Sequence, residues 1–99
     1  MIRGTTPTLE FQLPFETDVI QKAYVTFATG ATVVLEKSID DCICKGDKLI
    51  IKMSQRDTLA LTGGAVVDIQ IRVLTFENEA LASNIIRTSV SQILKDGEI

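Results

Sequence analysis

Two cysteines separated by one residue are the first side chains whose type and spacing suggest chemistry. On an extended strand, Cys42 and Cys44 would point to the same face, with a separation at the upper limit for a disulfide. A zinc site needs about four nitrogen or sulfur ligands, and the chain has no histidine and no third cysteine. We therefore expect two partly buried thiols, with a metal shared across a subunit interface as the alternative.

Two pairs of carboxylates offer a weaker case for catalysis. Asp40 and Asp41 are adjacent, and neighbouring side chains of a strand point to opposite faces. Glu77 and Glu79 flank a predicted turn, where two charges are usually solvated. Without histidine, a serine or cysteine nucleophile also lacks its usual general base. We expect no enzyme activity, catalytic residue, cofactor, resident metal or small-molecule substrate; catalysis or Ca²⁺ binding by these carboxylates is the alternative.

Charge and hydropathy argue against two classes of partner. The 99 residues carry 10 Lys and Arg against 13 Asp and Glu, a net charge of −3. The cations are scattered, whereas binding several phosphates requires a cluster. The longest apolar runs are three residues, far short of the ~20 that span a bilayer. The opening residues also lack the apolar centre of a signal peptide. We expect synthesis in the cytosol, no nucleic-acid binding and no membrane insertion.

Short strands must position these side chains. The chain has 12 Ile, 9 Leu, 8 Val and 11 Thr, and β-branched residues favour sheet over helix. Turn signals recur roughly every 8–12 residues, as in a sandwich or barrel. Strands are expected at 8–13, 22–28, 32–37, 39–44, 48–53, 66–76 and 81–90. After Ser54, which could cap the amide of Asp57, a single helical turn is expected before Gly63 and Gly64.

The strongest alternation runs from 66 to 76. Its apolar positions are Val67, Ile69, Ile71 and Val73. A register slip of one residue would expose all of them, so the pairing should be well specified. At 32–37, Val33 and Leu35 are expected on one face and Val34 on the other, while 81–90 has two mixed faces and should bend or bulge. The pattern predicts an all-β, immunoglobulin-like β-sandwich of about seven antiparallel strands with one short helical turn, in a single domain spanning 1–99. A small barrel of five or six strands is the alternative.

Aliphatic side chains exceed what a small core needs. The sequence is 45% hydrophobic, and its mean hydropathy is +0.25. Predicted outer faces and termini carry Ile2, Val34, Ile50, Val66, Ile85, Ile93, Leu94 and Ile99. Such a surplus favours subunit contacts or strand exchange; the competing interpretation is a generous core. The candidate interface residues are Ile2, Phe15, Ile93, Leu94 and Ile99. The segment through Pro7 and the tail from Ile93 are the expected docking elements.

Five segments together resemble a known group of proteins. They read MIRGTTPT at 1–8, LPF at 13–15, VVLEK at 33–37, IQIRVLT at 69–75 and ALASNII at 80–86. They resemble small, poorly characterised prophage virion-associated proteins of Gram-positive gut bacteria, over nearly the whole chain. More loosely, the chain is similar to the N-terminal β-sandwich of phage baseplate upper proteins.

The resemblance implies a noncatalytic structural role in a phage particle. The tail or baseplate is the first expectation and head decoration the next, with phage structural proteins and copies of the chain itself as partners in a homo-oligomer. The protein would be made in the bacterial cytoplasm and then become virion-associated. A carbohydrate- or host-surface-binding module is the alternative. Phe11 and Phe27 are expected in the core, which leaves Tyr24, Phe15 and Phe76 as the aromatic rings that could stack on a sugar.

Overall fold

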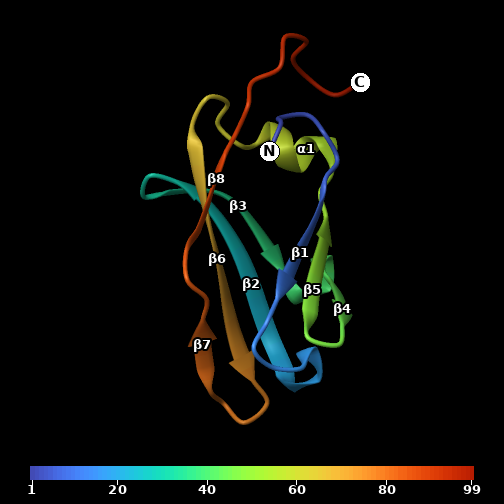
Figure 1. Cartoon of the computed structure of the whole chain (residues 1–99), viewed down its shortest axis with the longest axis vertical. Helices are drawn as coiled ribbons and strands as arrows, with labels where there is room; N and C mark the ends of the chain where they lie inside the picture. The colour runs from blue at the N-terminus through green and yellow to red at the C-terminus, as the bar shows by residue number, and fades with distance from the viewer.

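Two antiparallel sheets face each other in the computed structural model, which describes all residues from 1 to 99 (Figure 1). The larger sheet has the order β3 (Thr32–Ser38), β2 (Ile20–Thr29), β6 (Val66–Thr75), and then β7 (Ala80–Ala82) and β8 (Ile86–Ser89) together along the outer edge of β6. The smaller sheet has the order β1 (Thr8–Gln12), β5 (Lys48–Lys52), β4 (Ile43–Lys45). Three one-turn helices are η1 (Thr17–Val19), η2 (Ile39–Asp41) and α1 (Gln55–Leu59). The predicted all-β sandwich is confirmed at this level of architecture.

The core lies between the two sheets. The alternation predicted for β6 holds, because Val67, Ile69, Ile71 and Val73 are all buried. On β2, Val25 lies opposite Ile71 and Phe27 opposite Ile69. The smaller sheet contributes Leu49 and Ile51, which with Phe27 are among the largest fully buried side chains. Burial of one face of every central strand therefore fixes the register of both sheets.

Strand β3 differs from its predicted pattern at one residue. Phe27 pairs with Leu35 but Ala28 pairs with Val33, so Val34 is an extra residue in the ladder, a β-bulge. The bulge turns Val33 outward, where it is exposed, and lets Val34 pack partly against the core. The prediction that Val33 shares a face with Leu35 is therefore wrong, because an alternation of period two does not survive an inserted residue.

The strand predicted at 39–44 is shorter, because its first half is the helical turn η2. Ser38 and Asp41 form a capping box, in which the backbone N–H of Ser38 donates to the Asp41 carboxylate over 2.9 Å. This local pairing competes with the sheet ladder and ends β3. The chain crosses to the smaller sheet through this turn, and only Ile43–Lys45 forms β4.

The segment at 81–90, predicted to bend, is divided into β7 and β8. Between them, the N–H of Ser83 donates to the carbonyl of Ile71 over 2.8 Å. In return, the N–H of Ile71 donates to the Ser83 hydroxyl over 3.0 Å. A side-chain oxygen thus takes the place of a backbone carbonyl, so the N–H of Ile71 keeps a partner at the bend.

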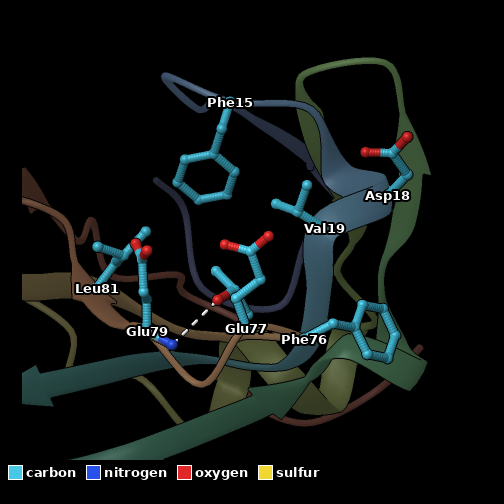
Figure 2. A pocket seen from close by; sticks show the side chains of 8 residues that line it. Phe15, Asp18, Val19, Phe76, Glu77, Glu79 and Leu81 are labelled. Atoms are coloured by element: carbon cyan, nitrogen blue, oxygen red, sulfur yellow. Dashed lines mark hydrogen bonds between the residues drawn. The ribbon is translucent and has the colours of Figure 1, made fainter.

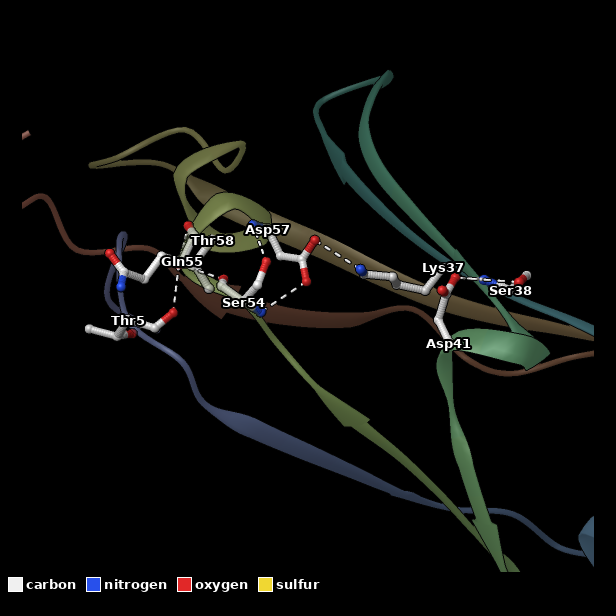
Figure 3. Close-up of polar contacts among 8 residues, drawn as sticks. All are labelled: Thr5, Lys37, Ser38, Asp41, Ser54, Gln55, Asp57 and Thr58. Carbon is white, nitrogen blue, oxygen red and sulfur yellow. Dashed lines mark hydrogen bonds and ion pairs between the residues drawn. The ribbon is translucent and has the colours of Figure 1, made fainter. Parts of the chain in front are cut away.

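The helix α1 begins where the sequence predicts. The Ser54 hydroxyl accepts from the Asp57 N–H over 3.1 Å, and the Asp57 carboxylate accepts from the Ser54 N–H over 2.9 Å. The buried Thr58 hydroxyl then donates to the carbonyl of Thr5 over 2.8 Å, which joins the helix to the N-terminal segment (Figure 3).

The C-terminal end of α1 is satisfied by Arg3. Its guanidinium donates to the carbonyl of Leu61 over 2.9 Å and to that of Leu59 over 3.0 Å. These carbonyls lack helical partners, and a cation near a helix C-terminus is electrostatically favourable. Ile2 and Ser91 also pair in an isolated parallel β-bridge, so the N-terminal segment is held against the segment that follows β8.

Truncation of Ile51 tests this account of the core. We expect Ile51→Ala to lower the free energy of unfolding by about 2–5 kcal/mol, because it leaves a cavity between the sheets. Ile43→Ala is the matched control, since Ile43 is 48% exposed on the adjacent strand, and should change stability by less than about 0.5 kcal/mol. Denaturant unfolding measures both, and equal losses would contradict the placement of the core.

Candidate functional site

An apolar groove lies at the end of the sandwich opposite α1 (Figures 1 and 2). It consists of two adjoining hollows of ≈ 490 Å³ and ≈ 210 Å³, which share Phe15 and Leu81 as lining residues. Leu13 and Val73 add to its apolar lining. The groove is open to solvent and brings residues 13–19 of one segment against residues 71–83 of another.

One wall of the groove is the connection from β1 to β2. Leu13 N–H donates to the carbonyl of Asp47 over 2.8 Å, and the Thr17 hydroxyl donates to that of Gly46 over 2.7 Å. Pro14 cannot donate to a ladder and breaks the strand, so Phe15 lies in the turn that follows. The wall is therefore anchored to the β4–β5 hairpin.

The opposite wall is the turn from β6 to β7. The N–H of Thr75 donates to the carbonyl of Glu79 over 2.9 Å, and the N–H of Glu79 donates back to the Thr75 hydroxyl over 3.1 Å. Asn78 adopts a positive φ of 64°, a conformation that asparagine tolerates better than most residues. Phe76 N–H donates to the carbonyl of Val19 over 3.0 Å and ties the two walls together.

The aromatic rings near the groove do not form one stacking platform. In Figure 2 the Phe15 ring points into the groove, above Glu77 and beside Leu81, whereas Phe76 points away from it. Phe76 is 69% exposed. The third candidate, Tyr24, is 45% exposed and lies elsewhere, on the outer face of the larger sheet and opposite Arg72.

The rim of the groove is acidic. Asp18, Glu77 and Glu79 line it together with the apolar side chains, and no cation is among the lining residues. None of the three carboxylates takes part in an ion pair. No group of three or more Cys, Asp or Glu side chains in the molecule is placed to hold a metal ion. The groove can therefore accept an apolar side chain next to a cation.

No family model, curated protein or solved structure matches this chain. No helix of the fold is long and apolar enough to span a bilayer.

The structure divides the predicted interface residues between the two ends of the sandwich. Phe15 alone lies in the groove. Ile2, Ile93, Leu94 and Ile99 lie at the α1 end, where the side chain of Ile93 lies near Gly4 and the side chains of Leu94 and Ile99 are fully exposed. Sequence reasoning missed Leu81 as a groove residue, although its place opposite Val73 on a neighbouring strand follows once the turn at 77–79 is accepted.

The two cysteines are free thiols in different surroundings. Cys44 is exposed in β4, whereas Cys42 is half-buried and donates to the carbonyl of Ser38 over 3.2 Å. Burial, with the charges of Cys44 and Asp41, raises the pKa of Cys42 to about 11. The Cys42 side chain therefore stays a neutral thiol near pH 7, which disfavours both nucleophilic chemistry and metal ligation.

An ion pair joins α1 to β3 across the molecule. Lys37 Nζ lies 2.8 Å from an Asp57 carboxylate oxygen, and their side chains are only 17% and 13% exposed (Figure 3). Burial alone would raise the pKa of Asp57, but hydrogen bonds from Lys37 and Ser54 outweigh it, so the pKa lies below its usual value. The pair therefore holds the α1 end against the larger sheet.

The low pKa of Asp57 predicts how stability depends on pH. A carboxyl whose pKa is depressed by folding stabilises the protein fully above its unfolded pKa of about 3.9, and the contribution is lost as the pH falls through the lower folded pKa. We expect Asp57→Asn to lower the free energy of unfolding at pH 7 by about 2 kcal/mol, because Lys37 loses its charged partner. The difference from wild type should shrink as the pH falls below about 4.

Urea unfolding at a series of pH values measures this difference. Asp40→Asn is the matched control, because Asp40 is exposed and belongs to no ion pair. A gap between wild type and Asp57→Asn that is constant or grows in acid would contradict the proposed role of the carboxylate.

Proposed function

We propose that this protein is a noncatalytic structural component of a phage particle that acts through protein–protein assembly. The resemblance of the sequence to prophage virion-associated proteins supports the phage context and, within it, a tail or baseplate location ahead of head decoration. The assembly mechanism has separate support from the surface of the molecule.

The observation that carries the assembly proposal is an apolar surface that the single chain leaves uncovered. The groove opens beside Leu81, and the same edge of the larger sheet continues through Ile85 and Ile86, all three exposed. Single exposed aliphatic residues are ordinary on a protein surface, but a groove and an edge that adjoin are typical of an interaction site. A neighbouring protein seated there would remove this surface from water.

Particle association is the direct test of the proposed role. Particles released by induction from a strain that carries the tagged chain should contain it, and labelling in electron micrographs should mark the tail. Label on the head would support a structural role and reject the tail location. A chain that is absent from particles and strictly monomeric would contradict the proposal.

Leu81→Asp tests the assembly surface itself. A charge in the groove should weaken self-association about tenfold or more, because an unpaired carboxylate would have to be desolvated in the contact. Val33→Asp is the matched control, since Val33 is also apolar and exposed but lies on β3, at the other edge of the same sheet. Light scattering over a range of concentrations measures both variants, and equal behaviour would exclude the groove as the contact.

A carbohydrate- or host-surface-binding module is the second candidate, favoured by one feature. Tyr24 lines a shallow depression of ≈ 230 Å³ on the outer face of the larger sheet, with Lys22 and Arg72 beside it. An exposed aromatic face can stack on a sugar ring, and two cations would favour an acidic glycan.

Tyr24→Ala tests this candidate. If the depression binds glycans, an acidic cell-wall polysaccharide cast into the gel should slow the migration of the wild-type protein in affinity electrophoresis. Tyr24→Ala should migrate without this retardation. Phe76→Ala is the control, because that exposed ring lies away from the depression. Equal migration of wild type and Tyr24→Ala would reject glycan binding at this site.

A further inference from the structure

We propose that the bend at Leu94 and Lys95 of one copy docks in the apolar groove of a second copy, so that the chains assemble head to tail. This inference rests on the assembly function proposed above and specifies its contact. Leu94 enters the groove beside Phe15 and Leu81, and Lys95 meets the acidic rim.

The docking segment is exposed but held in place. The side chain of Leu94 is fully exposed. The chain on its C-terminal side is anchored to its own subunit, since Arg3 pairs with Asp96 at 3.2 Å and Gln55 exchanges two hydrogen bonds with Ile99. The bend is therefore presented in a defined position, and ordering it on binding costs less conformational entropy than ordering a free tail.

The groove complements this segment in apolar character and charge. Its floor is apolar, and its rim carries Glu77 and Glu79 with no cation to pair with. In Figure 2 the Glu77 carboxylate extends into the space beneath Phe15, where a bound ammonium could reach it. Lys95 follows the exposed leucine directly and makes no ion pair in its own subunit. Leu94 followed by Lys95 therefore offers the apolar side chain and the adjacent cation that the groove can bind.

The two features cannot meet within one copy. The molecule measures 47 × 26 × 16 Å, and the groove and the tail lie at opposite ends of its longest axis (Figure 1). A contact between different surfaces of identical chains is heterologous, so it builds a ring if the rotation closes and a filament if it does not. In both the ring and the filament, the bend of each copy contacts the groove of the next, so all copies have the same orientation along the assembly.

Charge reversal at the two surfaces tests the contact without touching the core. Lys95→Glu and Glu79→Lys should each weaken self-association about tenfold, because each places like charges in the contact. An equimolar mixture of the two should recover assembly, since the residue at position 95 of each variant then meets a residue of opposite charge at position 79 of the other. Lys45→Glu and Glu36→Lys are the controls with the same change of net charge, at exposed positions that form no ion pair.

Analytical ultracentrifugation of each variant and of the mixture gives the outcome. Leu94→Asp is a further variant, and it should abolish association with no change in melting temperature, because that side chain makes no buried contact in its own subunit. Wild-type-like assembly of the single variants, or no recovery in the mixture, would overturn the head-to-tail contact and leave the assembly function in place. A wild-type chain that stays monomeric but is found in particles would also overturn only this contact. A chain both monomeric and absent from particles would overturn the two proposals together.

Discussion

Strand β6 can bury only one of its two faces, and this constraint determines where both candidate surfaces lie. With Ile71 and Val73 inside, the pairing of β6 with β7 places Leu81 opposite Val73, at the mouth of the groove. The same register turns Arg72 outward, opposite Tyr24 on β2. A slip of one residue would exchange the two faces and abolish the groove and the outer depression together. The energy that maintains the register comes from the apolar area removed from water between the sheets.

Much of the fold could be predicted from local patterns. The alternation in β6, the glycine at the β2–β3 hairpin and the Ser54–Asp57 cap each specify structure within a few residues. The same Ser-x-x-Asp spacing occurs at Ser38–Asp41, and it signalled the helical turn that a strand prediction overlooked. The bulge at Val34 had no such signal, because it reflects how β3 fits against β2 rather than any preference of its own sequence.

The candidate site was less accessible to prediction. Phe15 could be suspected because Pro14 breaks the strand before it, but the groove needs residues from two segments that only the folded sandwich brings together. The anchoring of the tail also depends on segments that only the folded structure brings together. Arg3, at the beginning of the chain, binds carbonyl groups at the C-terminal end of α1 and a carboxylate near the C-terminus, which places three distant segments at one end of the molecule. No spacing along the sequence indicates such a meeting.

The hydrogen bond between the Ile71 N–H and the Ser83 hydroxyl has a consequence for solubility. An unbroken apolar edge strand would offer a template on which foreign chains could add and form amyloid-like aggregates. Here the bend at Ser83 leaves only three residues in β7 and four in β8. Neither piece is long enough to hold an added strand firmly. This edge of the larger sheet can thus carry exposed Leu81, Ile85 and Ile86 while it offers only short segments to an incoming strand.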